Sequence, residues 1–156
     1  TDDGSASTRR KMRTGTSVRL ICGSEAEDFA KTFLAAFGMP EPFSPALAAL
    51  LAPSIGLPHA YHYVAVADGA LVGTCSLLVH GKFAILGSAG VIPSRRRTGA
   101  AMNLAIAAVA EARDQGAETV LLQTAAGTPL ERLLRISGFS RAFTRVGYTL
   151  DHEAAD

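Results

Sequence analysis

Residues 89 to 101 read Ala-Gly-Val-Ile-Pro-Ser-Arg-Arg-Arg-Thr-Gly-Ala-Ala, and they join a short apolar strand to an alanine-rich helix. Val91 and Ile92 are typical of the end of a strand, and Pro93 stops it because proline has no N–H group to offer a sheet. From residue 102 to 114 the apolar side chains recur at helical spacing. The stretch therefore predicts a tight turn that leads into the first turn of a helix over residues 98 to 101.

This turn has the properties of an anion-binding site. The N–H groups in the first turn of a helix have no partner inside the helix, and the helix dipole adds partial positive charge that attracts phosphate. Gly99, Ala100 and Ala101 keep large side chains away from such a ligand. Arg96 and Arg97 can donate charge-assisted hydrogen bonds to phosphate oxygens. The residues predict a phosphate or pyrophosphate site.

A solvated basic turn whose helix is capped by Thr98 is the alternative, since short glycine motifs also match by chance. The spacing favours the binding site. The string Val-x-Pro-x-x-Arg-x-x-Gly-x-Ala over residues 91 to 101 resembles the acyl-coenzyme A signature of the GNAT acetyltransferase superfamily, Gln/Arg-x-x-Gly-x-Gly/Ala. Only Arg96 lies three residues before Gly99 with a small residue two positions after it. The resemblance implies that residues 96 to 101 hold the pyrophosphate of acetyl-coenzyme A.

The rest of the chain predicts an α/β fold. An Asp-Gly pair at residues 68–69 between apolar runs predicts a hairpin, and a strand–helix–strand crossover over residues 84 to 123 predicts two parallel strands. The order is β-α-α-β-β-β-α-β-α-β(-β), which is also the GNAT order, and the resemblance covers residues 18 to 150. It implies a mixed, mostly antiparallel central sheet flanked by helices. The expected strands are 18–21, 61–67, 71–79, 83–92, 118–123 and one or two within 139–150, and the expected helices are 24–37, 45–51, 98–114 and 130–136.

Several local patterns add expectations that a structure can test. Ser24 and Glu27 have the spacing of a capping box at the start of the first helix. Phenylalanines at positions 29, 33 and 37 form a stripe of the kind that usually packs in a core. Residues 120–122 are expected to be buried on both faces of the sheet. The cysteines at positions 22 and 75 are expected to be free and buried.

Composition bounds the organisation of the chain. With 156 residues and 48% hydrophobic residues it suits a single domain over residues 18–150, after a flexible tail at 1–17 and before a C-terminal tail at 151–156. A net charge of +1 argues against a nucleic-acid-binding protein. No run approaches the roughly 18 apolar residues of a membrane span, and no signal peptide is recognisable. We expect a cytoplasmic protein with no metal site, because no metal-ligand spacing occurs.

The resemblance also implies how the coenzyme lies. In the family a bulge splays the fourth strand from the fifth and leaves a cleft for the pantetheine arm. Gly87 and Gly90 are suited to such a bulge. Carried over by position, the backbone around Gly90 and Val91 lines the pantetheine, and the Ala89 N–H polarises the thioester carbonyl.

The catalytic side chains are less defined. Many members have a tyrosine four residues before a closing Gly-Phe, where Leu134 stands here, and some have a glutamate on the fourth strand, which this chain lacks. Tyr148, Ser137 and His80 are the candidate side chains, with Thr128 and His62 as further ones. For each, a helix cap or an ordinary surface group is the alternative.

The function that follows is acetyl transfer from acetyl-coenzyme A to a primary amine in a ternary complex, without a covalent intermediate. A module that binds an acyl-coenzyme A and senses it without turnover is the alternative. Residues 37 to 58 are apolar with few charges, which favours a small or partly apolar acceptor. The acceptor's identity, the length of the acyl group and the oligomeric state, a homodimer included, are left open.

Overall fold

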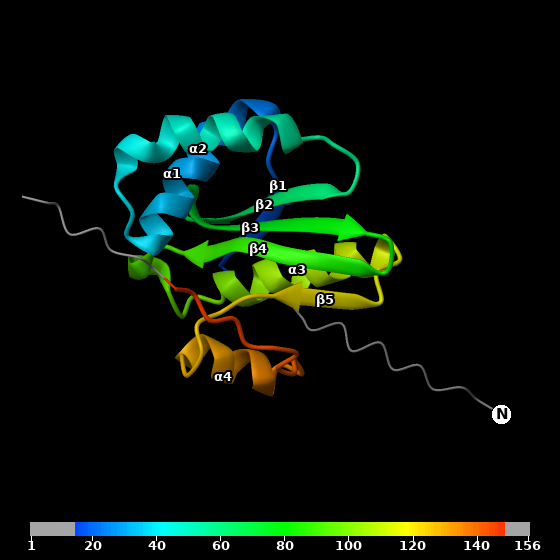
Figure 1. Cartoon of the computed structure of the whole chain (residues 1–156). Coiled ribbons are helices and arrows are strands. Elements are labelled where there is room, and N and C mark those ends of the chain that lie inside the picture. Colours follow the sequence, from blue (N-terminus) through cyan, green and yellow to red (C-terminus); the bar gives the residue numbers. More distant parts are fainter. Residues whose placement is uncertain (1–14, 149–156) are drawn as a thin grey trace, which may run out of the picture. The chain divides into compact units, whose positions relative to one another are not determined.

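The computed structural model describes residues 15–148, which form two compact units, one up to Leu122 and one from Gln123 onward (Figure 1). The first unit is a five-stranded sheet with three helices, and the second contains one helix, α4 (Pro129–Ile136). The elements of the first unit are β1 (Ser17–Leu20), α1 (Ala26–Phe37), α2 (Ser44–Leu51), β2 (Ala60–Ala67), β3 (Ala70–His80), β4 (Phe83–Val91), α3 (Ala100–Asp114) and β5 (Thr119–Leu122).

The strands lie in the sheet in the order in which they occur in the chain. The first four are antiparallel to their neighbours, and β5 runs parallel to β4 after the crossover through α3. Asp68 and Gly69, both with positive φ, close the β2–β3 hairpin as their Asp-Gly sequence predicts. The predicted fold class, a mixed and mostly antiparallel sheet flanked by helices, is confirmed.

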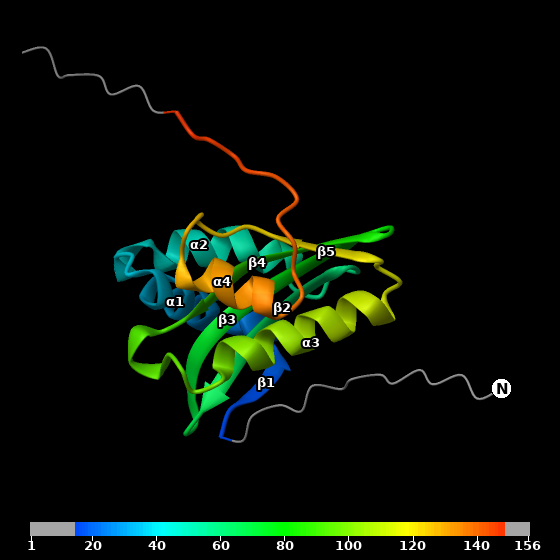
Figure 2. The same ribbon diagram turned by 90° about the horizontal axis from the view of Figure 1, so that it is seen from below.

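The helices of the first unit cover opposite faces of the sheet. Figure 1 shows α1 and α2 on one side, and Figure 2, seen from below, shows α3 running across the other side. The alanines and Leu104 of α3 pack against inward-facing residues of β2, β3 and β4 to form the larger core. Phe29 of α1 packs with Ile21 and Val64 in a smaller core on the other face. Because side chains alternate along a strand, β2 contributes to both cores, with Tyr63 and Ala65 in the larger one and Val64 in the smaller one.

A bulge interrupts β4 between its two glycines. Thr74 of β3 lies opposite Gly90 and Ser76 lies opposite Gly87, so β4 has one more residue than β3 across this interval. Ser88 adopts a positive φ of 48°, and its carbonyl accepts a hydrogen bond from the buried Thr74 hydroxyl at 2.8 Å. The bulge predicted at Gly87 and Gly90 is confirmed.

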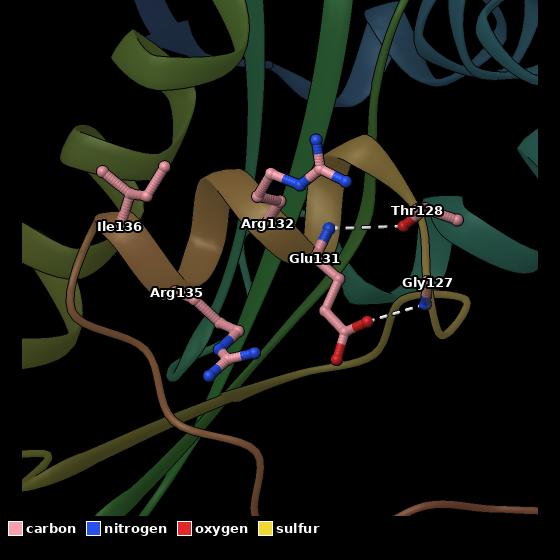
Figure 3. Close-up of a pocket in the computed structure, with 6 residues that line it drawn as sticks. All are labelled: Gly127, Thr128, Glu131, Arg132, Arg135 and Ile136. Atoms are coloured by element: carbon pink, nitrogen blue, oxygen red, sulfur yellow. Dashed lines mark hydrogen bonds between the residues drawn. The ribbon is translucent and has the colours of Figure 1, made fainter.

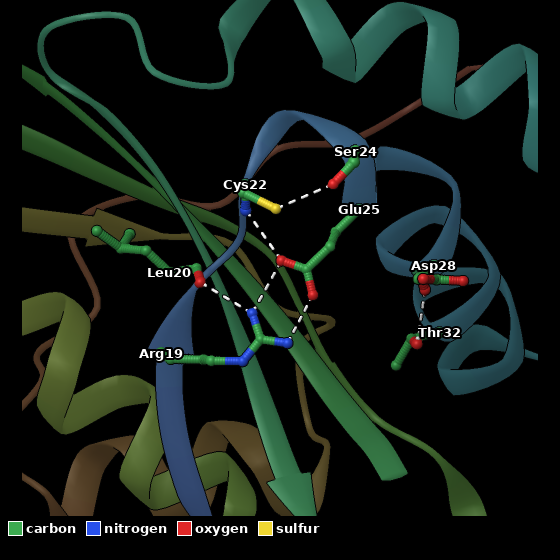
Figure 4. Close-up of polar contacts among 7 residues, drawn as sticks. All are labelled: Arg19, Leu20, Cys22, Ser24, Glu25, Asp28 and Thr32. Atoms are coloured by element: carbon green, nitrogen blue, oxygen red, sulfur yellow. Dashed lines mark hydrogen bonds and ion pairs between the residues drawn. The ribbon is translucent and has the colours of Figure 1, made fainter. Parts of the chain in front are cut away.

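The start of α1 differs from the prediction. The backbone N–H of Cys22 donates to Glu25 Oε2 at 2.9 Å, and the Arg19 guanidinium donates to both Glu25 oxygens at 2.6 and 2.9 Å (Figure 4). The capping box predicted at Ser24 and Glu27 is therefore wrong. A 3-10 turn, Gly23–Glu25, precedes α1 and moves the capping carboxylate two residues toward the N-terminus.

Three burial predictions are also corrected. Phe29 is in the core, but Phe37 at the end of the stripe is 53% exposed, although the edge of its ring lies against Gly90 of β4. Cys22 is exposed and Cys75 is buried, so only one of the two free cysteines is a core residue. Val120 and its neighbours in β5 are half-buried, since β5 is an edge strand of the described sheet.

The ends of the domain also differ from expectation. The first strand begins at Ser17, and the Thr16 carbonyl just before it accepts a hydrogen bond from Asn103 Nδ2 at 3.0 Å. No strand forms over residues 139–148, so the strands predicted within 139–150 are wrong as far as the described chain extends. The described part of the second unit, residues 123–148, contains no strand with which these residues could pair. Residues 1–14 and 149–156, including the predicted C-terminal tail, lie outside the described residues.

The contact between α1 and β4 predicts a steric cost at Gly90. A Cβ there would lie 2.8 Å from Phe37 Cε2 and 3.0 Å from Ala36 Cβ, whereas a Cβ at Gly87 would meet nothing within 4 Å. We expect Gly90→Ala to lower the free energy of unfolding by about 1–3 kcal/mol and Gly87→Ala to change it little. Urea unfolding of the two variants measures the difference, and equal effects would contradict the packing described here.

The contact between Arg19 and Glu25 predicts a pH dependence of stability. The Arg19 hydrogen bonds, helped by the Cys22 N–H, lower the pKa of Glu25 to about 2 from its ordinary 4.5. The stability from this carboxylate is present above pH 4.5 and is lost as the pH falls toward 2. We expect Glu25→Gln to destabilise the protein at pH 7 and to match the wild type near pH 2.

Unfolding at both pH values measures this difference. Glu27→Gln is the matched control, because Glu27 forms only an exposed pair with Lys31 at 2.9 Å. A difference between Glu25→Gln and the wild type that persists unchanged at pH 2 would show that the carboxylate does not act through its charge.

Candidate functional site

The turn between β4 and α3 leaves the start of the helix without a side-chain cap among the described residues. Thr98 Oγ1 donates instead to the Arg95 carbonyl at 2.7 Å, so the alternative in which Thr98 caps the helix is wrong. Gly99, at φ 95°, is the N-cap residue, and the first helical hydrogen bond runs from the Asn103 N–H to the Gly99 carbonyl at 2.9 Å. The backbone N–H groups of residues 100–102 are therefore not used by the helix.

The three arginines of the turn have different environments. Arg95 Nη1 pairs with Asp68 Oδ2 of the β2–β3 turn at 2.7 Å. Arg96 donates to two carbonyls, from Nη2 to Ala36 at 3.1 Å and from Nε to Val91 at 3.3 Å. The Arg97 side chain is exposed and makes no hydrogen bond or ion pair within residues 15–148. Arg96 thus holds the end of α1 against the end of β4, and Arg97 has the uncommitted guanidinium.

The outer edge of β4 has unused backbone donors just before this turn. Pairing of β4 with β5 ends at Leu86 and Leu122, so residues 87–91 have no strand on that side within the first unit. The Ile92 N–H points toward β3, where it bonds to the Val72 carbonyl at 2.9 Å. Because successive N–H groups of a strand point to opposite edges, those of Val91 and Ala89 point away from β3. The strand therefore offers two donors in line with the helix start.

A row of polar side chains crosses the face of the sheet that carries α1 and α2. His62 of β2 lies opposite Ser76 of β3, and Ser76 lies opposite Gly87 of β4. His62 Nδ1 is 2.8 Å from Ser76 Oγ, and its Nε2 is 2.9 Å from Ser54 Oγ. The Ser54 hydroxyl in turn donates to the Leu51 carbonyl at 2.7 Å.

These contacts define the protonation of His62. A serine hydroxyl has one proton, and that of Ser54 is used for Leu51, so Nε2 must be the donor to Ser54 and Nδ1 accepts from Ser76. The ring is buried, with 6% of its surface exposed, and burial lowers its pKa. His62 is a further candidate in the sequence analysis, with an ordinary surface group as the alternative. That alternative is wrong, because the ring is buried and contacts two serines that the local sequence does not reveal.

The other candidate side chains lie elsewhere. His80 pairs with Phe83 at the end of the β3–β4 hairpin, and six residues of extended strand, roughly 20 Å, separate Phe83 from Ala89. Ser137 follows α4, with its N–H bonded to the Leu133 carbonyl at 3.0 Å, and Tyr148 is 92% exposed. The structure thus places Ser137 and Tyr148 in the second unit and His80 away from the Ala89 backbone.

The second unit contains a pocket of about 520 Å³ along α4 (Figure 3). Thr128 caps the helix by accepting from the Glu131 N–H at 3.2 Å, and Glu131 Oε2 accepts from the Gly127 N–H at 2.7 Å. Glu131 also pairs with Arg141, and these contacts lower its pKa. Thr128 and Glu131 are therefore engaged in holding the start of α4, as the alternative for Thr128 proposed.

The described residues do not support a cysteine nucleophile or a metal site. Burial raises the pKa of the Cys75 thiol to about 12, which keeps it from acting as a nucleophile. Within residues 15–148 no three histidine, cysteine or acidic side chains gather where they could hold a metal ion. No helix in that range is both long and apolar enough to cross a membrane.

Comparison with solved structures finds many similar folds. An aminoglycoside acetyltransferase from an uncultured soil metagenomic sample superposes with a TM-score of 0.72 at 17% identity, over 87% of this chain and 99% of that one. A GCN5-related N-acetyltransferase from Ralstonia eutropha JMP134 gives 0.69 at 19% identity, over 87% and 99%. AAC(6')-Iy, solved with a bisubstrate analogue containing coenzyme A, gives 0.69 at 17% identity, over 88% and 99%. At these low sequence identities, the structural similarity shows that the chain shares the fold of these proteins, and it shows no more than that.

Sequence comparisons add the family. No curated protein matches the chain significantly. A family model described as the acetyltransferase (GNAT) family matches residues 26–139, which include α1, the bulged β4, the uncapped start of α3 and all of α4. The chain therefore belongs to the acetyltransferase (GNAT) family.

Proposed function

We propose that this protein is an N-acetyltransferase that moves the acetyl group of acetyl-coenzyme A to a primary amine in a ternary complex. The observation that carries the proposal is the continuity of two sets of free backbone donors. The open edge of β4 at Ala89 and Val91 leads directly into the uncapped start of α3. An extended pantetheine followed by a pyrophosphate requires donors in that sequence.

The residues of the turn fit the coenzyme. The free N–H groups at the start of α3 and the helix dipole favour a pyrophosphate, and Ala100 and Ala101 leave room for it. Arg97 supplies a guanidinium that no other group engages within the described chain, whereas Arg96 acts by fixing the turn. Thr98 and Gly99 contribute backbone, as do Ala89, Gly90 and Val91 along the pantetheine.

The chemistry would depend mainly on positioning. Holding the amine next to the thioester can supply about 7–11 kcal/mol through effective molarity. One well-placed N–H on the developing oxyanion, here that of Ala89, adds about 2.7–4 kcal/mol. Tyr148 and Ser137 remain candidates for protonating the departing thiolate. His80 is not carried forward, because it lies at the far end of the hairpin.

The surface around α1 and α2 supports a small, partly apolar acceptor. Residues 37 to 58 contain one acidic side chain, Glu41, and expose large apolar side chains, of which Phe37, Met39 and Phe43 are about half exposed. A polycation would need several carboxylates. We therefore propose an acceptor with a single amine and an apolar part, although several similar structures are described as aminoglycoside acetyltransferases.

The start of α3 gives a test of coenzyme binding. Ala101 is exposed at the second helical position, so Ala101→Asp places a carboxylate where the pyrophosphate would lie. We expect this variant to be as stable as the wild type or slightly more so, by about 0.3–1 kcal/mol from the helix dipole, and to lose the thermal stabilisation that acetyl-coenzyme A gives the wild type.

Thermal unfolding with and without acetyl-coenzyme A measures both effects, with NAD and ATP at equal concentration as ligand controls. Ala101→Ser is the matched uncharged variant and should still respond. A full response of Ala101→Asp, or equal responses of the wild type to all three ligands, would contradict the proposed coenzyme site.

The arginines predict a separation of binding from stability. Arg97→Gln should weaken acetyl-coenzyme A binding by about 1–3 kcal/mol, the usual value of a charge-assisted hydrogen bond, and leave unfolding unchanged. Arg96→Gln should mainly lower the free energy of unfolding, because the Arg96 guanidinium donates to the Ala36 and Val91 carbonyls. Calorimetric binding and urea unfolding of both variants check this. The reverse assignment would show that Arg96 is the phosphate ligand.

Turnover separates an enzyme from a sensor. The wild type is given acetyl-coenzyme A with a panel of amines, tyramine and histamine as small acceptors and neamine as a polycation, and release of free thiol is followed. We expect release that depends on the amine and is faster with the small acceptors. Tight coenzyme binding without release from any amine would favour the acyl-coenzyme A sensor.

A further inference from the structure

The polar row formed by Ser54, His62 and Ser76 connects two openings on the α1 and α2 face of the sheet. At one end Ser76 is the cross-strand partner of Gly87, where a Cβ would meet nothing within 4 Å. Gly87 immediately precedes the bulge at Ser88 and Ala89. At the other end, His62 is one of the residues that line a pocket of about 300 Å³, together with the loop of residues 55–58.

The position of the Gly87 opening suits the acceptor amine. The α3 helix, with the turn proposed for the pyrophosphate, covers the opposite face of the sheet. On the α1 and α2 face, Phe37 and Ala36 close the surface over Gly90, but Gly87 is left open. Cross-strand partners have Cα atoms about 4.5–5.5 Å apart, so Ser76 is the residue of β3 that lies next to this opening.

We propose that Ser76 and His62 form the proton relay for the acceptor amine, with Ser76 taking the proton at the Gly87 opening and His62 Nδ1 receiving the hydroxyl proton of Ser76. This inference rests on the proposed acetyl transfer. It assigns a base to a site in which the fourth strand has no carboxylate.

Attack of the amine on the thioester moves one proton along the relay. The amine lone pair forms the bond to the acetyl carbon, and the carbon–sulfur bond breaks with its electron pair going to the coenzyme sulfur. The proton lost by the nitrogen goes to Ser76 Oγ while the Ser76 proton goes to Nδ1, which makes His62 an imidazolium. That imidazolium releases its proton to solvent through the pocket of residues 55–58, and the thiolate takes one proton, either from solvent directly or from one of the candidate acids, Tyr148 and Ser137, which solvent then reprotonates.

The surroundings of His62 suit a proton-accepting imidazole that is neutral at rest and is charged only transiently during the reaction. Its neighbours are the Ser76 hydroxyl from β3, the Ser54 hydroxyl from the turn after α2 and the Phe29 ring of α1, whose centroid is 5.9 Å away. No charged side chain of the described residues contributes to its pKa, which burial lowers. Ser54 and the Leu51 carbonyl at the end of α2 polarise Nε2–H and so stabilise the cation.

The test compares variants in thiol release with the amine of the panel that the wild type uses. Ser76→Ala removes the hydroxyl and leaves His62, while His62→Gln keeps hydrogen-bonding groups without a titratable ring. We expect each to lower kcat about 100-fold, within the usual range for general base catalysis, with the KM for acetyl-coenzyme A unchanged. Ser76→Thr should restore most of the rate because it keeps the hydroxyl.

The pH profile of kcat distinguishes a relay from a structural role. The kcat of the wild type should reach a plateau at pH values above the lowered pKa of His62. The kcat of both variants should instead keep rising with hydroxide concentration. His80→Gln, at an exposed histidine outside the row, is the control and should keep the wild-type profile. Thermal unfolding of every variant confirms that it is folded at the assay temperature.

The outcomes separate the relay from the function. If the wild type acetylates an amine and both Ser76→Ala and His62→Gln keep its kcat within threefold and its pH profile, the relay is wrong and the acetyltransferase stands. If the wild type acetylates no amine of the panel, the proposed function fails and the relay fails with it.

Discussion

The hydrogen bond from the Thr74 hydroxyl to the Ser88 carbonyl is the interaction on which the site depends. It holds one extra residue in β4 and so turns the strand at a fixed place. Beyond that place β4 no longer pairs with β5, and its outer N–H groups remain available. Because Thr74 is fully buried, its hydroxyl cannot turn to water, and packing around it keeps the bulge at this position.

A second constraint joins the bulge to the turn between β4 and α3. Gly90 allows α1 to pack directly on β4, and Arg96 then reaches from the turn to the Ala36 carbonyl of α1 and to Val91. The same short segment therefore carries the splayed strand, the helix contact and the start of α3. This explains why Arg96, which the sequence pattern predicts to be a phosphate ligand, holds the backbone in the structure. The side chain of Arg97 beside it forms no hydrogen bond or ion pair within residues 15–148.

Much of the fold was predictable because its signals are local. The Asp-Gly hairpin, the helical spacing in α3 and the two glycines around the bulge all gave the correct elements. The predictions were wrong where a pattern of neighbouring residues is overridden by contacts with residues that are distant in the chain. Arg19 from β1 draws Glu25 into the capping position in place of Glu27, and residues 139–148 have strand-like composition but no strand partner in their own unit.

The sequence by itself determined that a tight turn with a glycine and small residues leads from β4 into α3, because proline ends the strand and helical spacing follows it. It also determined the family, since the family model matches residues 26–139, which include the segment with the spacing of Arg96, Gly99 and Ala101. Only the tertiary structure decided which polar groups meet. Ser54, His62 and Ser76 are joined by strand register and by the turn after α2, and register depends on pairing between segments that are not adjacent in the chain.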